Sequence, residues 1–532
     1  MRAFARLLDR LTLTPSRNGK LRLIRDHLAQ TPDPDRGWAL AAITRDLDIA
    51  SIKPAMLRAL VAERVDAELF ALSYEFVGDM AETIALIWPE PAAPEESPPL
   101  GEVVDRLHSV SRREAPRLVE SMLDTLDAQE RFALLKLVTG GLRVGVSARL
   151  AKQAVADLGG RDVAEIEEIW HGLTPPYAAL FAWLDGGERP YFDATSAFRP
   201  VMLATPLTEA DLAALDPAEF IAEWKWDGIR VQASGGPETR VLYSRTGDDI
   251  SGAFPDLIEA LDFHGTLDGE LLVASPGGLT EGVGSFSDLQ QRLNRKSVTA
   301  KLRAAHPAVL RAYDLLHDGT RDLRGSPFAE RRAALEEFVA GLDPARFDLS
   351  PRIAFGTWDD LAAARADPPH PVIEGVMLKR ADSVYVAGRP KGPWFKWKRD
   401  PMIVDAVLMY AQRGHGKRSG YYSDYTFGVW DGDALVPVGK AYFGFTDAEL
   451  TEIDRFVREN TTDRFGPVRA VRAEPDHGMV FEIAFEGLNR STRHKSGVTM
   501  RFPRISRIRR DKPPAEADRI ETLRALLAEM EV

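Results

Sequence analysis

The stretch Glu223-Trp-Lys-Trp-Asp-Gly-Ile-Arg230 carries a lysine, an aspartate-glycine pair and an arginine at the spacing Lys-x-Asp-Gly-x-Arg. An apolar stretch ends just before it, and residues 229–233 alternate between apolar and polar side chains, as strands do. This pattern predicts that Lys225 lies in a tight glycine-containing turn between two strands. In such a turn its amine can approach a bound phosphate.

A lysine of this kind acts as a nucleophile only when its ammonium group is deprotonated. Burial, nearby positive charge or a metal-bound substrate must therefore lower its pKa. The alternative interpretation of Lys225 is a solvated lysine beside a common Asp-Gly turn. Both interpretations fit the local pattern, so the choice depends on whether further lysines and carboxylates occur elsewhere in the chain.

The composition is that of a globular protein with several domains. The chain has 532 residues, which at roughly 150 residues a domain predicts three or four domains. It contains no cysteine, which excludes disulfides, a thiol nucleophile and a four-cysteine zinc module. The N-terminus is interrupted by charge and no segment is apolar enough to span a membrane, so we expect a cytoplasmic protein.

The charges are distributed unevenly along the chain. The net charge of −12 argues by itself against a nucleic-acid partner, because phosphate binding usually requires a basic surface. Between residues 490 and 512, however, nine basic residues are accompanied by one acidic residue, Asp511. They are Arg490, Arg493, Lys495, Arg501, Arg504, Arg507, Arg509, Arg510 and Lys512. This segment is predicted to bind anions, and a solvated charged face is the alternative.

Residues 1 to about 190 are predicted to form an all-helical domain. Segments 113–123 and 128–138 place apolar residues three and four positions apart, which is the period of a helix. The proline-rich segment 89–100 is expected to form a solvated loop within this domain.

A glycine-rich segment interrupts the helical pattern at residues 140–147. We expect Ser147 to cap the following helix and Gly159-Gly160 to end it. Exposed glycines beside Arg143 would let the backbone approach a phosphate chain. A plain connection between two helices explains the same local pattern equally well.

The pattern changes to short alternating strands after residue 198. Between residues 198 and 400, strands are predicted at 229–234, 239–244, 266–274, 309–316, 372–380 and 394–399, with a helix at 329–340. This mixture predicts an α+β domain. From residue 401, strands are predicted at 403–412, 425–430, 435–440 and 479–485, and a terminal helix at 515–531. Five or so short strands in this length fit a small barrel, commonly of the OB type.

Carboxylates occur on two of the predicted strands. Strand alternation places Asp268 and Glu270 on one face, and Glu374 begins another strand beside a glycine. Two carboxylates from separate strands are suitable for Mg²⁺, which prefers few carboxylate ligands, water and substrate phosphate oxygens. A glutamate at a strand end is more often simply solvated, so neither residue is decisive alone.

Cations and an aromatic ring complete the candidate site. In Trp394-Phe-Lys-Trp-Lys398 the two lysines share one face, and they repel each other unless an anion such as an α-phosphate lies between them. Arg230 and Arg245 add forked donors suited to ribose and phosphate oxygens. Tyr313 lies in a strand pattern, where it either stacks on a base or packs in the core.

Seven motifs resemble, in type and order, those of ATP-dependent DNA ligases. They are Lys225-x-Asp-Gly-x-Arg230, Ser-Arg245, Asp-Gly-Glu270, Tyr313-Asp, Glu374-Gly, Lys396-x-Lys398 and Arg509-x-Asp-Lys512. The helical region, including Gly141-Leu-Arg-Val-Gly145, is similar to the DNA-binding domain of the eukaryotic DNA ligase I type, in a compact form like that of bacterial repair ligases.

The resemblance implies three domains that encircle nicked duplex DNA. These are an all-α DNA-binding domain over 1–195, in which Arg143 would contact DNA, an α+β nucleotidyltransferase (adenylation) domain over 196–400, and an OB-fold β-barrel domain with a C-terminal helix over 401–532. It also implies ATP and Mg²⁺ or Mn²⁺ as cofactors, nicked double-stranded DNA as the partner, and a monomer.

The resemblance further implies a reaction in three steps. Lys225 attacks the α-phosphate of ATP to give lysyl-AMP, AMP passes to the 5′-phosphate at a nick, and the 3′-hydroxyl displaces AMP. The other implied roles are adenine selection for Glu223, base stacking for Tyr313, ribose or phosphate contacts for Arg230 and Arg245, ribose or metal binding for Glu270, metal binding for Glu374, the α-phosphate for Lys396 and Lys398, and the β- and γ-phosphates for Arg509 and Lys512 with Arg504, Arg507 and Asp511. Longer relatives often carry phenylalanine in place of Tyr313.

Four other classes share part of this pattern. An mRNA-capping guanylyltransferase has the same lysine turn and core, but the helical first domain argues against it. NAD-dependent DNA ligases usually carry a four-cysteine zinc module, which this chain lacks. An RNA ligase is disfavoured by the Arg-x-Asp-Lys segment, and a non-catalytic nick-binding protein need not keep the lysines and glutamates together.

Overall fold

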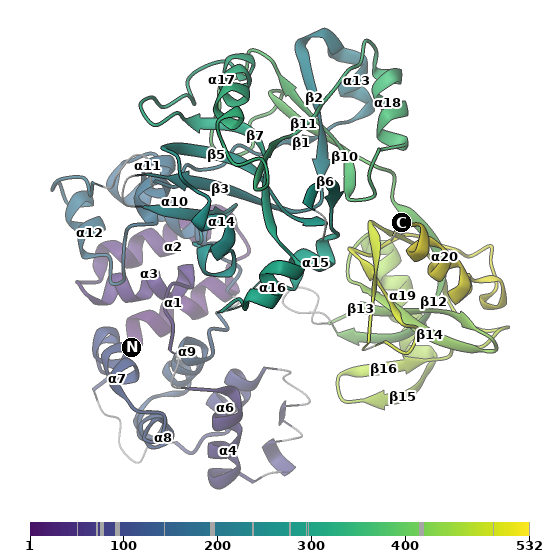
Figure 1. The fold of residues 1–532 in the computed structure, drawn as a ribbon. Coiled ribbons are helices and arrows are strands. Elements are labelled where there is room, and N and C mark those ends of the chain that lie inside the picture. Colours follow the sequence, from purple (N-terminus) through teal and green to yellow (C-terminus); the bar gives the residue numbers. More distant parts are fainter. Residues whose placement is uncertain are drawn as a thin grey trace.

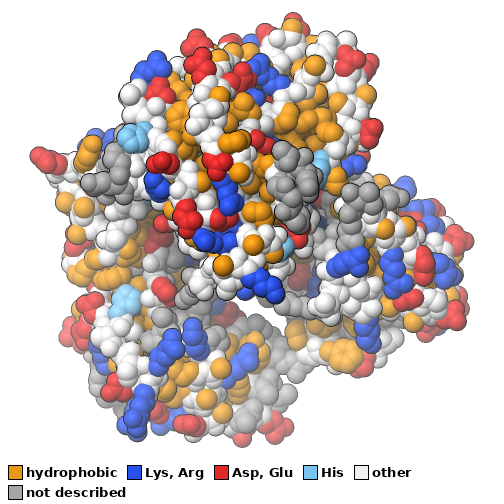
Figure 2. Space-filling view, in the orientation of Figure 1, with side chains coloured by type: hydrophobic (Ala, Val, Ile, Leu, Met, Phe, Trp, Pro, Cys, Tyr) orange, Lys and Arg blue, Asp and Glu red, His pale blue; other side chains and the backbone are white. Residues whose placement is uncertain are grey.

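The computed structural model describes residues 1–49, 52–66, 68–70, 73–74, 79–90, 96–142, 144–191, 197–236, 239–275, 278–293, 295, 297–413, 420–492 and 494–530. In chain order these residues form a helical region, a middle region with two larger sheets, and a C-terminal region of strands and two α-helices (Figure 1). Basic and acidic side chains are interspersed over the face shown in Figure 2. No described helix is long and apolar enough to cross a membrane.

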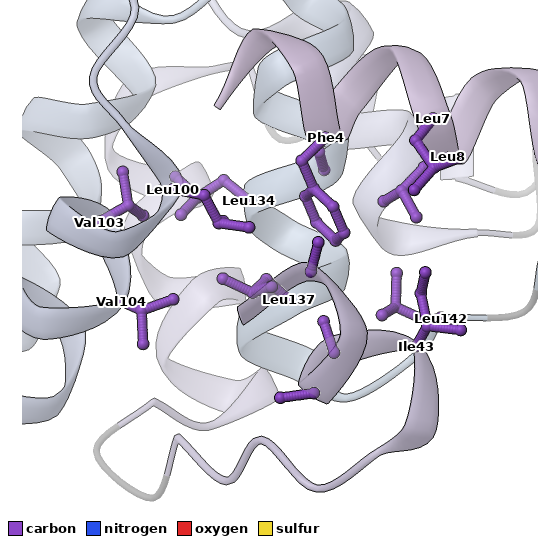
Figure 3. Packing of buried hydrophobic residues seen from close by; sticks show 14 of the residues in the cluster. Phe4, Leu7, Leu8, Ile43, Leu100, Val103, Val104, Leu134, Leu137 and Leu142 are labelled. Atoms are coloured by element: carbon purple, nitrogen blue, oxygen red, sulfur yellow. The ribbon is translucent and has the colours of Figure 1, made fainter. Parts of the chain in front are cut away.

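The first region is helical, as predicted. Its described helices are α1 (Arg2–Leu13), α2 (Arg17–Gln30), α3 (Asp35–Thr44), α4 (Pro54–Arg64), α6 (Met80–Ile87), α7 (Leu100–Ser109), α8 (Ala115–Thr125), α9 (Ala128–Thr139), α10 (Ala148–Gly159), α11 (Val163–Trp170) and α12 (Ala178–Leu184). Phe4, Leu8 and Leu134 are buried in their common core (Figure 3). Burying one such side chain stabilises the fold by roughly 1.5–3 kcal/mol.

The predicted ends of α10 are confirmed. The Leu150 amide donates to the Ser147 hydroxyl at 3.2 Å, which caps the helix N-terminus, and Gly160 follows the last turn in the left-handed conformation with φ 61°. Lys20 fixes the glycine-rich connection before α10 by hydrogen bonds to its backbone. Its ammonium donates to the Val144 carbonyl at 2.6 Å and to the Gly145 carbonyl at 3.1 Å.

The middle region contains both helices and strands. Its elements are β1 (Thr205–Pro206), α13 (Glu209–Ala214), η1 (Pro217–Glu219), β2 (Phe220–Trp226), β3 (Ile229–Gly235), β4 (Arg240–Ser244), η2 (Ser251–Ala253), α14 (Pro255–Glu259), β5 (Gly265–Ser275), β6 (Gly278–Val283), α15 (Phe286–Gln290), α16 (Ala300–Ala305), β7 (Ala308–His317), α17 (Phe328–Ala340), β8 (Phe347–Leu349), β9 (Arg352–Ile353), α18 (Trp358–Ala366), β10 (Ile373–Arg380) and β11 (Trp394–Lys398). The α+β character is as predicted.

The strands form two sheets, of order β1-β11-β10-β2-β9 and β4-β3-β5-β7-β8, with β6 on β5. Lys225 lies within β2 rather than in the turn itself, and the Asp227-Gly228 turn leads from β2 in one sheet to β3 in the other. A Cβ atom at Gly228 would lie 2.5 Å from the Leu271 carbonyl oxygen of β5. The close approach of two backbones therefore requires glycine here.

The C-terminal region consists of β12 (Met402–Arg413), β13 (Tyr422–Asp431), β14 (Ala434–Ala441), α19 (Asp447–Glu459), β15 (Thr461–Phe465), β16 (Val468–Val471), β17 (Val480–Phe485), β18 (Gly487–Arg490), β19 (Val498–Arg501), β20 (Arg504–Ile508), η4 (Pro514–Glu516) and α20 (Ile520–Met530). The strands exceed the five or so predicted. The additional strands are four or five residues long, which is too short to show the alternation that signals a strand.

The central sheet of this region runs β14-β13-β12-β16-β15, and β17 pairs with both β12 and β20. Phe427, Phe481 and Ile483 are buried in the core that this sheet surrounds. The terminal helix begins at Ile520, later than the predicted residue 515, because Pro513 and Pro514 precede it and the chain first forms a 3₁₀ turn.

Candidate active site

A cavity of about 450 Å³ opens between the two sheets of the middle region. Eight of the predicted site residues line it, namely Glu223, Lys225, Arg230, Arg245, Glu270, Tyr313, Glu374 and Lys396. These residues come from strands β2, β3, β5, β7, β10 and β11 and from the turn after β4. The convergence on Lys225 expected from the sequence is therefore present.

Lys225 forms an ion pair with Glu374, with 2.7 Å between the Lys225 Nζ and Glu374 Oε2 atoms. Burial opposes the charged form of Lys225, but the carboxylates of Glu374 and Glu270 outweigh it and raise the pKa of Lys225 above its ordinary value. A nucleophilic lysine requires a lowered pKa, and the residues of this site do not supply it in the protein without its substrates. The two neighbouring carboxylates are the physical reason.

A β-bulge places Glu374 beside the lysine. Gly375 pairs with Lys225 across the two strands, while Ile373 pairs with Trp226, so Glu374 is the extra residue on β10. Burial disfavours the Glu374 carboxylate, yet the ammonium of Lys225 holds the pKa of Glu374 below its ordinary value. The ion pair therefore keeps Glu374 ionised beside the Lys225 ammonium.

Glu270 faces the same cavity but has no ion pair or side-chain hydrogen bond with any described residue. Burial raises the pKa of Glu270 to about 8. Asp268, which was predicted to share its face, has a different role, because Arg230 binds its two oxygens at 3.0 and 2.6 Å and the Tyr385 hydroxyl donates to it at 2.7 Å. Asp268 therefore positions Arg230.

Hydrogen bonds to three residues fix the Arg230 side chain. Besides Asp268, it donates to the Met202 carbonyl at 2.6 Å and to the Tyr385 hydroxyl at 3.1 Å. One N–H group on Nη1 remains for a ligand. Arg230 can therefore contribute a fixed positive charge to the cavity with little freedom to move.

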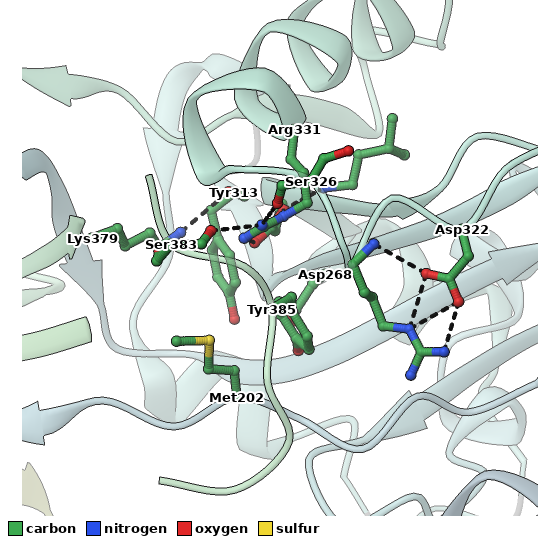
Figure 4. Close-up of polar contacts among 12 residues, drawn as sticks. Met202, Asp268, Tyr313, Asp322, Ser326, Arg331, Lys379, Ser383 and Tyr385 are labelled. Carbon is green, nitrogen blue, oxygen red and sulfur yellow. Dashed lines mark hydrogen bonds and ion pairs between the residues drawn. The ribbon is translucent and has the colours of Figure 1, made fainter. Parts of the chain in front are cut away.

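A buried ionic network forms one end of the cavity. The Glu223 carboxylate accepts from Arg332 at 2.6 Å through one oxygen and from Lys379 at 2.8 Å through the other. The Lys379 ammonium also donates to the Tyr313 carbonyl at 3.2 Å (Figure 4) and lies 4.4 Å from the centre of the Tyr313 ring. Burial lowers the pKa of Lys379, and Glu223 partly opposes this.

Asp314 explains the second half of the Tyr313-Asp motif. Its carboxylate is fully buried and accepts from Arg331 at 2.8 and 2.9 Å. Arg331 also donates to the carbonyls of Ser326 and Ser383 (Figure 4). The motif therefore fixes β7, and Tyr313 with it, against α17 and the loop after β10.

The two predicted lysines differ in their partners, because Lys396 has no ion pair with a described residue, whereas Lys398 pairs with Glu486 at 2.6 Å and with Glu374 at 3.8 Å. Lys396 lines the cavity, while Phe395 and Trp397 pack on the opposite face, as predicted. Lys398 does not line the cavity, because Glu486 of the C-terminal region binds its ammonium at 2.6 Å. A second link between these regions joins Arg501 to Asp227 in the turn after Lys225.

Arg509 and Lys512 lie away from the cavity, on the C-terminal region itself. Both donate to one oxygen of Asp405, each at 2.7 Å. The basic segment is also less charged than its sequence indicates, because carboxylates from other elements pair with it: Glu482 with Arg507, Glu486 with Arg504, and Glu452 with Arg510. Arg143 lies outside the described residues.

Sequence reasoning missed several residues that line or support the cavity. Met377 and Arg389 line it, and Arg332 and Tyr385 support it from behind. The strand alternation of 373–380 places Lys379 on the same face as Met377, and this pattern could have predicted that both side chains line the cavity. Arg332 lies on a helix far along the chain, and nothing in its local pattern indicates the contact with Glu223.

Between the two sheets a half-buried lysine stands among carboxylates and cations, an arrangement typical of a nucleotidyltransferase. Residues 1–156, 201–398 and 418–512 match the family models described as DNA ligase N terminus, ATP dependent DNA ligase domain and ATP dependent DNA ligase C terminal region. The chain belongs to the family of ATP-dependent DNA ligases, enzymes that form phosphodiester bonds. This assignment favours a ligase over a capping guanylyltransferase or a non-catalytic nick-binding protein.

The relatives agree with this assignment. The chain is 35% identical over 460 residues to a probable DNA ligase of Koribacter versatilis, covering 81% of this chain and 78% of that protein. It is 34% identical over 463 residues to a probable DNA ligase of Anaeromyxobacter sp. Fw109-5, covering 82% and 86%. A solved structure titled Pmar-Lig_PreS3 shares the fold with a TM-score of 0.60 at 16% identity, over 95% of this chain and 99% of that one.

Proposed function

We propose that this ligase seals nicks between a 3′-hydroxyl and a 5′-phosphate in duplex DNA, with Lys225 as the residue that accepts AMP. The observation that carries the proposal is the contact of Lys225 Nζ with Glu374 at 2.7 Å inside a cavity lined by Arg230, Arg245 and Lys396. An amine that attacks phosphorus must lose a proton. The ion pair with Glu374 must therefore weaken before Lys225 can attack.

The residues around Lys225 favour phosphoryl transfer over other chemistry. Such transfer depends on positioning and on neutralising charge at the phosphoryl oxygens. Lys396 and Arg245 line the cavity with no carboxylate partner among the described residues. A bound phosphate group would neutralise their positive charge. The three steps then use one site, in which the α-phosphate moves from ATP to Lys225 and on to the 5′-phosphate of DNA.

The residues present fit a divalent cation with oxygen ligands. Glu270 faces the cavity and forms no ion pair with any described residue, and Glu374 lines the cavity from another strand. We propose that these two carboxylates hold Mg²⁺ or Mn²⁺ together with substrate oxygens, as few-ligand sites for these ions do. When bound, the ion would neutralise phosphate charge and weaken the hold of Glu374 on Lys225.

We propose that adenine lies at the Glu223 end of the cavity, against the Tyr313 ring. Each Glu223 oxygen is oriented by a cation and keeps a lone pair, which can accept from the exocyclic amine of adenine. The carbonyl oxygen of guanine would meet these lone pairs with repulsion.

The three regions of the chain have distinct proposed roles. We infer an OB-fold for residues 401–532, supported by the sheet that surrounds one core, a DNA-binding role for residues 1–195 with Arg143, and a nucleotidyltransferase domain over 196–400. We expect a cytoplasmic monomer that closes around nicked duplex.

The test is covalent labelling with α-labelled ATP and a divalent ion. The wild-type protein should acquire label and Lys225→Ala should not, while Lys391→Ala, an exposed lysine outside the cavity, should label normally. The labelled protein should then seal nicked DNA without added ATP. Labelling from GTP in preference to ATP, or labelling of Lys225→Ala, would contradict the proposal.

A further inference from the structure

A cluster of ion pairs joins the helical region to the middle region. Glu168 of α11 binds Arg324, which lies in the segment between β7 and α17, at 2.7 Å. Glu168 also binds Arg189 at 3.2 Å, and Asp322 binds the Arg324 guanidinium at 2.6 Å. The side chains of Glu168 and Arg324 are each 27% exposed. This pair is therefore partly covered by the two regions that it joins.

Two other contacts lie on the same boundary. The ring of His171, directly after α11, meets the ring of Tyr243 on β4 edge-on, with 5.5 Å between the ring centres. The guanidinium of Arg149 on α10 covers the backbone at Gly388, where an added Cβ atom would lie 3.4 Å from Arg149 Nη2. Helices α10 and α11 therefore contact several separate segments of the middle region.

The contact at Arg324 continues to the wall of the cavity. The Arg324 carbonyl accepts from the Tyr385 amide at 2.8 Å. The Tyr385 hydroxyl donates to Asp268 at 2.7 Å and accepts from Arg230 at 3.1 Å, and Figure 4 shows Tyr385 close to Asp268. Arg230 in turn lines the cavity. A short series of polar contacts thus connects Glu168 of the helical region to Arg230.

The inner part of this series has little room to adjust. Tyr385 is 5% exposed and Asp268 is fully buried. Because close-packed interiors transmit a displacement rather than absorb it, a shift of the Arg324 backbone would move Tyr385 and then Arg230. Binding and reaction of a nucleotide depend on such positions, so this shift would weaken the binding of ATP.

We propose that Glu168 is a positioning residue for the first step of ligation. By holding Arg324 it keeps Tyr385, and through it Arg230, in the geometry that binds ATP. The inference rests on the proposed transfer of AMP from ATP to Lys225. It gives the helical region a part in nucleotide binding as well as its proposed part in DNA binding. Since such coupling is reciprocal, bound ATP also favours the docked arrangement of the helical region.

A pair of matched variants separates this contact from a general change of charge on α11. Glu168→Gln removes the charge of Glu168 and keeps its shape. Glu165→Gln makes the same change on the same helix, at a residue that forms no ion pair with any described residue. The thermal midpoints of both variants should match that of the wild type.

The first arm measures the rate of self-adenylation of the full-length protein against the concentration of labelled ATP, with pyrophosphatase present. Glu168→Gln should raise the ATP concentration for the half-maximal rate by about two- to fivefold, as for loss of a partly exposed ion pair. The maximal rate should not change, because Glu168 touches no reacting group. An unchanged half-maximal concentration for Glu168→Gln, or an equal rise for Glu165→Gln, overturns the proposal.

The second arm tests the path through Tyr385. Tyr385→Phe keeps the ring and removes the hydroxyl that contacts Asp268 and Arg230. In this background, and in Arg324→Gln as a second background, Glu168→Gln should raise the half-maximal ATP concentration no further. A rise as large as in the wild-type background overturns the path. Failure of the wild type to label would instead reject Lys225 as the acceptor.

Discussion

Glu486 of the C-terminal region forms an ion pair with Lys398, and we expect this ion pair to slow self-adenylation. Lys398 is one of the two lysines assigned to the α-phosphate, yet its ammonium lies 2.6 Å from Glu486 of the C-terminal region. Before Lys398 can meet a phosphate, this ion pair must break. Glu486→Gln removes the charge and keeps the shape, so it should speed self-adenylation.

The magnitude follows from the exposure of the pair. The side chains of Lys398 and Glu486 are 37% and 27% exposed. Ion pairs with such access to water contribute up to about 1 kcal/mol, which corresponds to a rate increase of up to roughly fivefold. Added salt should narrow the difference between variant and wild type, because it screens the pair.

The assay is the initial rate of label incorporation from α-labelled ATP at concentrations well below saturation. Glu474→Gln is the control, because Glu474 pairs with Arg472 at 2.7 Å inside the C-terminal region and neither residue lines the cavity. A rate for Glu486→Gln equal to or below that of the wild type would refute the reasoning, as would an equal acceleration by Glu474→Gln.

Three further predictions concern other parts of the chain. Arg509→Ala or Lys512→Ala should slow self-adenylation more than the sealing of pre-adenylated nicks, and equal losses in the two assays would contradict this. Gly228→Ala should lower stability by roughly 1–3 kcal/mol and abolish labelling, because the new Cβ would lie 2.5 Å from a β5 carbonyl, whereas Gly252→Ala, with no atom within 4 Å, should leave the thermal midpoint unchanged. Burial lowers the pKa of His27 to about 4, whereas the unfolded chain binds this proton below about pH 6.5. The free energy of unfolding should therefore fall by up to about 3 kcal/mol as the pH drops from 6.5 to 4. The unfolding midpoint of His27→Gln should depend less on pH over that range.

Local patterns were sufficient to predict the longer elements of the fold. The predicted strands 266–274, 309–316 and 403–412 each differ by one residue at either end from β5, β7 and β12, because their alternation is strong and their length leaves little ambiguity. Short charged strands such as β18 and β19 were not predicted. They are strands because they pair with each other. A segment of four residues is too short for its sequence pattern to predict this pairing.

The placement of charged groups depended on contacts that no local pattern describes. Asp268 and Glu270 are two residues apart on one strand, yet the first is fixed by Arg230 and the second faces the cavity with no ion pair to any residue that the structure describes. The raised pKa of Lys225 likewise results from Glu374, which lies 149 residues away in the chain.

The sequence by itself determined the family of this protein, because residue types at fixed spacing match the motifs of ATP-dependent DNA ligases. It also determined the helical and α+β character of the first two regions, since periodicity is a property of each segment. Only the tertiary structure decided which sheet each strand joins, which acids neutralise the basic C-terminal segment, and that Arg509 and Lys512 bind Asp405 rather than line the cavity. These features depend on contacts between residues far apart in the chain and on the relative positions of the domains, and local sequence encodes neither.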